Sequence, residues 1–260
     1  MINRKPNTNI KLLLFLGIFV SISSCETKES FTFQKRTIAI QDFFDCDTVD
    51  CAITEIFLLE SIQENEISNN INFEIEKTAC SALYLEEAPK NYHSIEKALQ
   101  SFNIEYQEMK KEFPEEIVPY EASINCEISF QNTTILSVFI DSYIYTGGAH
   151  GSGNATYLNL DLKTGKTINH NSLFKDINEF SSFAEMMFRK AHKISENASI
   201  NSTGFFFEND MFVLPANIGL TNTHVILLYN QYEISSYAEG PIELKLNKEE
   251  VTKYFAINIL

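Results

Sequence analysis

The chain has 260 residues, and its 20 basic and 35 acidic side chains give a formal charge of −15 at pH 7. A surface this acidic repels nucleic acids and anionic lipid head groups and attracts cationic proteins, so no nucleic acid is expected as a partner. The sequence contains neither an internal repeat nor a low-complexity segment.

Residues 1–24 are predicted to be a lipoprotein signal peptide. Arg4, Lys5 and Lys11 precede an apolar stretch over residues 12–20, and small residues follow it, which is the layout of an export signal. The apolar stretch is about half as long as the ~20 residues that a membrane-spanning helix needs. We therefore expect the stretch to direct export and not to remain as a transmembrane helix.

The segment Ile22-Ser23-Ser24-Cys25 resembles a bacterial lipobox, in which the chain is cut before the cysteine and the cysteine is acylated. Residues 25–30 would then tether the folded part to a lipid anchor, the only expected contact with the membrane. Loss of three basic residues leaves 17 − 35 = −18 charges. We expect a protein of the bacterial cell envelope, on the periplasmic or cell-surface side; the alternative is an ordinary secreted protein.

Four further cysteines indicate two disulfides, because an exported protein with an even number of cysteines usually pairs them. Three pairings are open on the sequence alone. We favour Cys46 with Cys51, which closes a short loop, and Cys80 with Cys126. A structural zinc site is the competing interpretation, and it is disfavoured because Cys80 and Cys126 lack close Cys or His neighbours.

Two strands come first in the predicted fold, over residues 31–40 and 52–59. An amphipathic helix follows, with apolar side chains at helical spacing over residues 67–82. Ser94 is a suitable N-cap for a second amphipathic helix, whose apolar face runs from Ile95 to Met109. Two prolines end that helix.

Alternating apolar residues next predict an antiparallel hairpin. Its strands cover residues 124–130 and 136–140, with a turn at residues 131–133. Cys126 points toward the core from the first of these strands. The first helix carries Cys80 at the edge of its apolar stripe and could bring it within bridging range, which is why we favour this pair.

The rest of the chain has the same mixed character. A strand over residues 157–162 turns at residues 163–166, and the expected elements after it are a helix over 180–194, strands over 212–214, 223–229 and 242–246, and a short helix over 248–254. Helices come in blocks between antiparallel hairpins. The predicted class is therefore α+β, with three amphipathic helices packed on the hairpins.

The stretch "YTGGAHGSGN" contains four of the nine glycines of the chain and one of its five histidines. Glycines between two strands allow positive φ and close backbone approach, as a sharp corner requires. Free amides in such a corner could also bind an anion. The structural corner is the favoured interpretation, and the candidate residues for the alternative, a binding corner, are Tyr145, Gly147, Gly148, His150 and Gly151.

His150 is expected to hold this loop through hydrogen bonds. The alternative is a catalytic or metal-binding role with a distant acid such as Asp141 or Asp161. The five histidines are at least twenty residues apart, so a helical pair of zinc ligands is impossible. No metal site and no cofactor are predicted.

Two other motifs fail on inspection. Gly165-Lys166-Thr167 resembles the end of a phosphate-binding loop, but Leu160 stands where that pattern requires glycine. Ser152 resembles a nucleophile elbow, whose glycines would have to stand two residues before and after it, where His150 and Asn154 are found. No catalytic residue is therefore assigned.

The segments "YTGGAHG", "YLNLDLKTGKTI" and "NSLFKD" resemble the extracytoplasmic region shared by RsiV-type anti-sigma factors and the N-terminal part of PdaC-type peptidoglycan deacetylases. The stretch "GLTNTHVILLYNQYEISSYAEGPIELKL" resembles the closing segment of that family. The resemblance implies two adjoining α+β modules, a PdaC-like one over residues 31–153 and an RsiV-like one over residues 154–255, with the glycine corner near their junction.

The resemblance implies a binding or sensing module, since the region binds lysozyme in the anti-sigma members. A lipobox replaces the sigma-binding segment and membrane helix, and no deacetylase domain follows, so neither of those activities is expected. We expect a non-enzymatic lipoprotein that binds a cationic protein such as lysozyme, or peptidoglycan fragments. The alternatives are an enzyme acting on cell-wall glycan or peptide with His150 in its site, and a structural or assembly lipoprotein.

Overall fold

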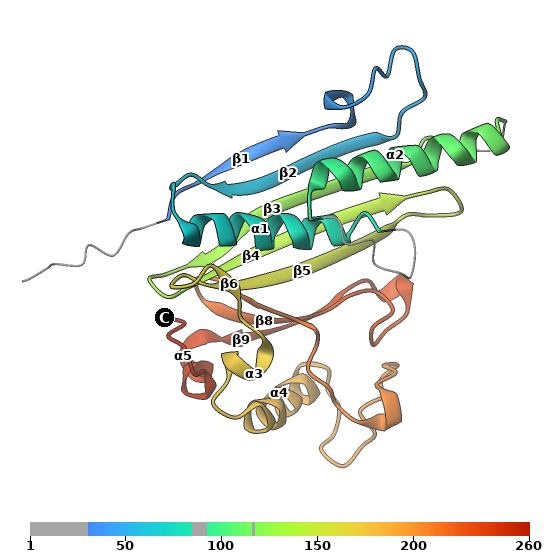
Figure 1. The fold of residues 1–260 in the computed structure, drawn as a ribbon. Coiled ribbons are helices and arrows are strands. Elements are labelled where there is room, and N and C mark those ends of the chain that lie inside the picture. The colour runs from blue at the N-terminus through green and yellow to red at the C-terminus, as the bar shows by residue number, and fades with distance from the viewer. Residues whose placement is uncertain (1–30, 85–92, 116–117) are drawn as a thin grey trace, which may run out of the picture.

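The computed structural model describes residues 31–84, 93–115 and 118–260. The predicted signal peptide (residues 1–24), the predicted lipid attachment site Cys25 and the predicted tether (residues 25–30) lie outside these residues. Strands form a six-stranded sheet of order β1-β2-β3-β4-β5-β6 and a three-stranded sheet of order β7-β8-β9 (Figure 1). The α+β class is confirmed, and within the described ranges no helix has the length and apolarity to cross a membrane.

The larger sheet carries the first core. Its strands are β1 (Phe33–Ile38), β2 (Ile53–Ser61), β3 (Glu121–Gln131), β4 (Ile135–Tyr145), β5 (Ser152–Asp161) and β6 (Lys166–Thr167). Every pair of neighbours is antiparallel except β2 and β3, which are parallel. The parallel pairing is possible because the chain crosses over through two helices between β2 and β3, and such a crossover lets β3 begin at the same end as β2.

Helices α1 (Glu66–Ser81) and α2 (Ile95–Glu112) cover one face of this sheet (Figure 1). The Asn65 side chain caps α1 by accepting a hydrogen bond from the Ser68 N–H. Ser94 occupies the N-cap position of α2 without a side-chain bond; the Ile95 N–H instead donates to Glu76 of α1, at 2.8 Å. The two helices therefore help to fix each other over the first core.

A second core lies between the smaller sheet and the C-terminal helices. These elements are α3 (His170–Leu173), α4 (Ile177–Ala191), β7 (Asn217–Leu220), β8 (His224–Tyr229), β9 (Ile242–Asn247) and α5 (Lys248–Val251), with 3₁₀ turns at Ile40–Asp42, Glu208–Asp210, Tyr237–Glu239 and Thr252–Tyr254. The strand expected over residues 212–214 is wrong. Pro215 directly follows this stretch and has no N–H to donate to a neighbouring strand, and the Val213 carbonyl accepts from the Tyr229 hydroxyl.

A β-bulge in β3 changes the expected core. Ile124 and Cys126 are buried beneath the helices as predicted, but Ile128 is 39% exposed and Phe130 belongs to the second core. The register of β3 against β4 shifts between Ile128 and Phe130. One extra residue in a strand turns the following side chains to the other face. The alternation of apolar residues predicts one shared face for Ile124, Cys126, Ile128 and Phe130, and the bulge shows that this prediction is wrong.

Of the two predicted disulfides, one is confirmed and the other is wrong. Cys46 and Cys51 form a disulfide, with Cα atoms 5.6 Å apart, as predicted. The predicted bond between Cys80 and Cys126 is wrong, because both are free and buried. A disulfide needs Cα atoms about 4.4–6.8 Å apart, and a layer of side chains separates a helix from the sheet beneath it. Burial raises the pKa of both thiols to about 12, so they remain protonated packing groups.

The module boundary expected between residues 153 and 154 stays a prediction. It falls within β5, all of which lies in the larger sheet. Leu158 and Leu160 of this strand pack in the first core, under the same helices as β3 and β4. The physical contact between the two cores is therefore made along β5 and the strands beside it.

Candidate functional site

The predicted glycine corner is the tip of the hairpin between β4 and β5. Gly147 and Gly148 have φ values of +100° and +87°, a backbone conformation that side chains disfavour. The Tyr145 hydroxyl donates a hydrogen bond to the Gly148 carbonyl, at 3.1 Å. These glycines therefore have the backbone freedom that the sequence suggested.

Gly151 serves a different purpose, which is close approach. A Cβ atom at this position would lie 2.4 Å from two atoms of the Tyr143 side chain. Tyr143 lies across the glycine and is 41% exposed. A side chain at Gly151 would displace this ring, so the glycine keeps an exposed aromatic residue at the tip.

His150 joins the two sequence motifs. Its Nδ1 atom lies 3.1 Å from the Gly151 carbonyl oxygen, and its ring stacks on Tyr237 with centroids 4.3 Å apart. Tyr237 in turn lies beside Tyr232, at 5.6 Å. Both tyrosines belong to the closing motif. The chain therefore brings the glycine corner and the closing motif together in one aromatic cluster.

Two asparagines hold the second motif against the first. The Asn230 side chain accepts from the Ala155 N–H and donates to the Ala155 carbonyl, both at 2.9 Å. Asn217 accepts from the Tyr157 N–H at 3.3 Å. The backbone groups of Ala155 and Tyr157 lie on the edge of β5 that faces β6. Because β6 pairs only with Leu160 and Asp161, this part of the edge has no neighbouring strand to bond with. Side-chain amides thus replace a neighbouring strand.

Replacing Asn230 by alanine is expected to lower the free energy of unfolding by about 1–3 kcal/mol, because both polar groups of Ala155 lose their partner. Urea denaturation measures this loss. Asn154→Ala is the matched control, since Asn154 is exposed and its amide contacts only Thr156 at 3.4 Å. Equal stabilities of the two variants would show that Asn230 does not hold the junction.

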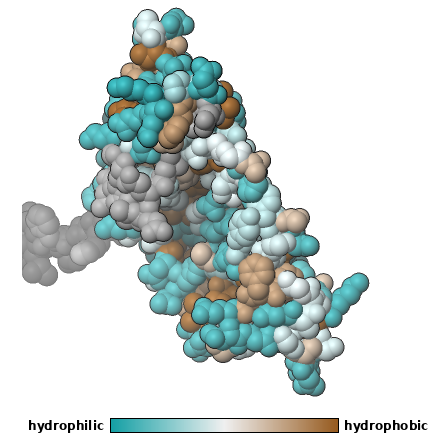
Figure 2. All heavy atoms as spheres, turned by 90° about the vertical axis from the view of Figure 1, so that its right-hand side faces the viewer, coloured by the Kyte–Doolittle hydropathy of each residue, from teal (hydrophilic) through white to brown (hydrophobic). Residues whose placement is uncertain are grey.

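Exposed apolar side chains extend the aromatic cluster over two loops. Tyr232 is 62% exposed, and Phe206, Met211 and Val213 are 48%, 59% and 57% exposed. The Phe206 N–H donates to the Ile234 carbonyl at 3.0 Å, which ties the two loops together. We call Phe206, Met211, Val213, Tyr232 and Tyr237 the loop surface. Figure 2 faces this side of the molecule and shows hydrophobic side chains scattered among hydrophilic ones.

Local strain is concentrated in these same loops. Asn209, Asp210 and Tyr232 have φ values of 53°, 59° and 67°, which non-glycine residues rarely adopt. Hydrogen bonds hold the strained backbone: Ser199 donates to Asp210 at 2.5 Å, and Asn201 bonds both the N–H and the carbonyl of Phe207. Strain of this kind persists only where the surroundings fix it. The loop surface is therefore preformed.

The charged side chains of the two loops all have the same sign. Residues 199–215 and 230–241 contain no lysine or arginine. Their four acidic residues are exposed, and these are Glu208, Asp210, Glu233 and Glu239. An apolar surface with an acidic border favours a partner that is cationic and has apolar groups of its own.

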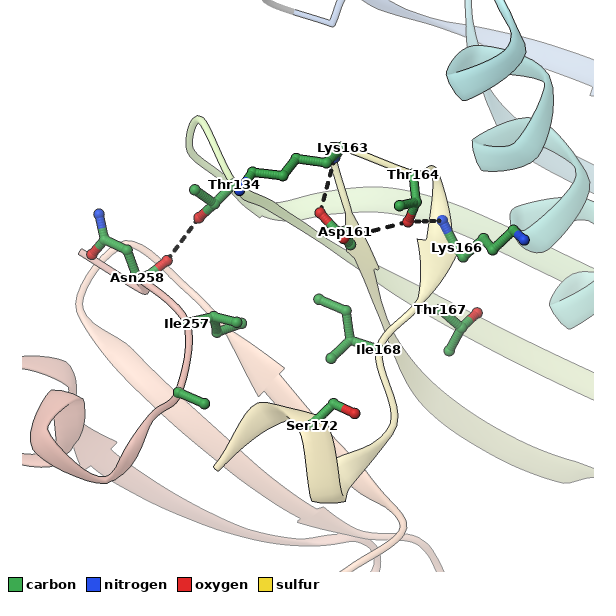
Figure 3. Close-up of a pocket in the computed structure, with 11 residues that line it drawn as sticks. Thr134, Asp161, Lys163, Thr164, Lys166, Thr167, Ile168, Ser172, Ile257 and Asn258 are labelled. Atoms are coloured by element: carbon green, nitrogen blue, oxygen red, sulfur yellow. Dashed lines mark hydrogen bonds between the residues drawn. The ribbon is translucent and has the colours of Figure 1, made fainter. Parts of the chain in front are cut away.

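A cavity of about 470 Å³ lies at the opposite end of β5, between the β5–β6 turn and the C-terminal segment (Figure 3). Its polar groups bond to one another: Asp161 accepts from the Lys163 N–H and the Thr164 hydroxyl, and Thr134 donates to the Asn258 carbonyl. The bonds of Asp161 hold the β5–β6 turn, and the bond from Thr134 joins the β3–β4 turn to the C-terminal segment. The cavity therefore has a structural explanation.

The structure separates His150 from one of its proposed acidic partners. Asp161 ends β5, whereas His150 precedes its first residue, and ten residues of strand span about 30 Å. The pairing of His150 with Asp161 is therefore wrong. In the described part of the chain, no group of three or more His, Cys, Asp or Glu residues is placed to hold a metal ion.

Tyr232 and Tyr237 are the site residues that the sequence did not single out. Both belong to the closing motif, but no periodicity in the sequence around them predicts that their side chains are exposed. Their contact with His150 depends on the path of the chain through both cores. The signal that could have found them is the motif itself, because aromatic residues outside a core pattern often lie at binding surfaces.

Comparison with known proteins supports this two-part arrangement. Residues 49–153 match the family model described as deacetylase PdaC, and residues 169–249 match DUF3298, a family of unknown function. No curated protein matches the chain significantly in sequence.

Two crystal structures share the fold. A DUF3298 family member from Bacteroides fragilis has a TM-score of 0.68 and 19% identity, over 89% of this chain and 96% of that one. A DUF3298 family protein from Pseudomonas aeruginosa has a TM-score of 0.60 and 16% identity, over 90% of this chain and 98% of that one. The chain thus combines a PdaC-like region with a DUF3298-like region, which confirms the family resemblance seen in its two motifs.

Proposed function

We propose that the protein is a lipid-anchored binding module of the bacterial cell envelope and that its loop surface binds a cationic protein. The observation that supports this proposal is the set of exposed apolar side chains on strained loops whose only charges are acidic. Aromatic side chains provide most of the binding energy in many interfaces. The acidic border adds long-range attraction, which raises the rate of encounter.

Lysozyme is the first partner to test. It is cationic, and the resemblance to anti-sigma factors that bind it suggests the same class of ligand here. The formal charge of −18 expected for the processed chain would attract it over distances of about a Debye length, roughly 10 Å at 0.1 M salt. Binding is therefore expected to weaken as salt rises.

Replacing Tyr232 by alanine is expected to weaken lysozyme binding at least about tenfold, because removal of an aromatic anchor typically costs more than 1 kcal/mol. Surface plasmon resonance at two salt concentrations measures the affinity. Met186→Ala is the matched control, since Met186 is 56% exposed on α4 and lies outside the loop surface.

The control variant should bind as tightly as the unchanged protein. Failure of the unchanged protein to bind lysozyme at low salt would reject lysozyme as the partner. Equal losses in Tyr232→Ala and Met186→Ala would reject the loop surface as the place of contact.

A further inference from the structure

One face of the six-stranded sheet is only partly covered. The second core lies against it at β4 and β5, where the Leu220 N–H donates to Ser137 and Asn159 donates to the Ile218 carbonyl. Side chains on β1, β2 and β3 point out from the same face beyond that contact. We call this open area, made by Lys35, Phe57, Asn125, Glu127, Phe139, Asp141 and Tyr143, the sheet surface.

The strand register places these side chains in order. Thr37, Phe57, Asn125 and Asp141 are opposite one another on β1, β2, β3 and β4 and so form one row across the sheet. Residues directly opposite in a sheet have their side chains on one face. An aromatic ring, an amide and a carboxylate therefore follow one another on neighbouring strands.

The polar groups beside Phe57 are held in place. The Lys35 ammonium donates to Asn125 at 3.0 Å and to Glu127 at 3.4 Å, and the Asn125 amide donates to Glu127 at 3.1 Å. Lys35 Nζ also lies 5.7 Å from the centre of the Phe57 ring. The network fixes a donor and two acceptors around an aromatic ring, at the edge of a depression of about 350 Å³.

Two more aromatic side chains lie across β3 from Phe57. Phe139 and Tyr143 are both on β4 and share the face of Asp141, and the Phe139 ring packs on Tyr157 with centroids 5.0 Å apart. Since β2 and β4 are two strand spacings apart, these rings lie roughly 10 Å or more from Phe57. That separation is comparable to the length of two linked sugar rings.

The chemistry of the sheet surface excludes two kinds of ligand. Glu127 and Asp141 outnumber Lys35, so anionic lipids and nucleic acids are repelled. A folded protein would be a poor fit, because charged side chains separate the aromatic residues and leave no continuous apolar anchor. A neutral sugar chain is not repelled by the acidic side chains, and it does not need a continuous apolar surface to bind.

Pyranose rings whose substituents are equatorial present C–H groups on both faces and hydroxyls at the edge. The C–H face suits an aromatic ring, and the hydroxyls can bond to amide, carboxylate and ammonium groups placed beside it. We propose that the sheet surface is a second binding site, which takes a neutral glycan of β-linked pyranose rings. The sheet surface shares no residue with the loop surface.

Titration with chitotetraose and with cellotetraose, followed by NMR and calorimetry on the purified protein, tests the proposal. Saturable binding of either sugar is expected, with shifts at Phe57 and Asn125. Asn125→Ala, which removes the central amide, and Phe57→Leu, which keeps apolar volume but removes the flat ring, are each expected to weaken binding at least tenfold. Thermal unfolding checks that both variants fold.

The control is Tyr232→Ala on the loop surface, which should leave glycan binding unchanged. Binding of chitotetraose alone would support a site that also contacts the acetamido group. Binding of both sugars would support a site that recognises only the sugar ring and its hydroxyls. The proposal is overturned if neither sugar binds, if folded Asn125→Ala and Phe57→Leu bind normally, or if Tyr232→Ala abolishes binding. If the protein binds the glycan but not lysozyme, only the proposal that lysozyme is the protein partner is rejected.

Discussion

Replacing Phe188 by alanine is expected to lower the free energy of unfolding by about 3–5 kcal/mol, the usual cost of truncating a fully buried phenylalanine. Phe188 lies on α4 and has no exposed surface. Its ring contacts five others, at centroid distances of 4.3–6.1 Å, and these belong to His192, Phe205, Phe207, Phe212 and Tyr229.

The same substitution tests how the loop surface is built. Phe205, Phe207 and Phe212 come from the loop that exposes Phe206 and Met211. Side chains that are buried or partly buried therefore lie between exposed ones along one segment, and they pack on Phe188. A cavity at that position should loosen the loop and weaken binding of the cationic partner as well as stability.

Urea denaturation and lysozyme affinity, measured on the same preparations, check both expectations for Phe188→Ala. Met186→Ala removes an exposed side chain from the same helix and should change stability by less than about 0.5 kcal/mol. A loss below 1 kcal/mol for Phe188→Ala would mean that the neighbouring rings collapse into the space. Unchanged affinity would show that the loop does not depend on this core.

The elements with long apolar patterns were predictable from the sequence. The stripes over residues 67–82 and 95–109 correspond to α1 and α2, and the stripe over residues 180–194 corresponds to α4. Each is long enough for a helical period to be recognised with few alternatives. The same holds for β3, β4 and β8, where apolar residues alternate or run together.

Features that depend on one residue or on chain path were not predictable. The bulge before Phe130 leaves no mark in the alternation of β3, so the alternation predicts the wrong face of the strand for this residue. The pairing of Cys80 with Cys126 required a distance between a helix and a sheet, which periodicity does not provide. The parallel pairing of β2 with β3 follows from the crossover through two helices.

The candidate site shows the same limit. Gly147 and Gly148 could be assigned to a corner because their composition has a direct backbone meaning, and their φ values agree. The stacking of His150 on Tyr237 could not be inferred, because it requires Asn230 to dock on the edge of β5. The backbone conformation of a short segment could be predicted from its residues, whereas the contact between two distant motifs could not.

A buried lysine at the junction of the two cores has a further consequence for stability. Lys248 is 2% exposed, and its ammonium lies 3.1 Å from the centre of the Phe130 ring and donates to the Thr221 carbonyl at 2.7 Å. Burial lowers the pKa of Lys248 to about 8. The cation–π contact and the hydrogen bond hold the charge in place, but they do not replace its hydration.

The sign of the pH dependence follows from proton binding. Between the folded pKa of about 8 and the ordinary value of 10.5, the unfolded chain binds a proton that the folded protein has released. Stability attributable to Lys248 therefore rises with pH across this range, by up to about 3 kcal/mol at 1.36 kcal/mol per pKa unit. Cys80 and Cys126 act in the opposite direction above about pH 9, because their folded pKa values are raised.

Comparison with Lys248→Met isolates the lysine, since the thiols contribute equally to both proteins. The free energy of unfolding of the unchanged protein minus that of the variant is expected to increase by about 3 kcal/mol between pH 7.5 and pH 10.5. Guanidinium denaturation at several pH values measures it. Lys245→Met removes an exposed lysine from β9, the strand that directly precedes Lys248, and it should keep the pH dependence of the unchanged protein. A constant difference for Lys248→Met would mean that Lys248 keeps its proton as readily in the folded protein as in the unfolded chain.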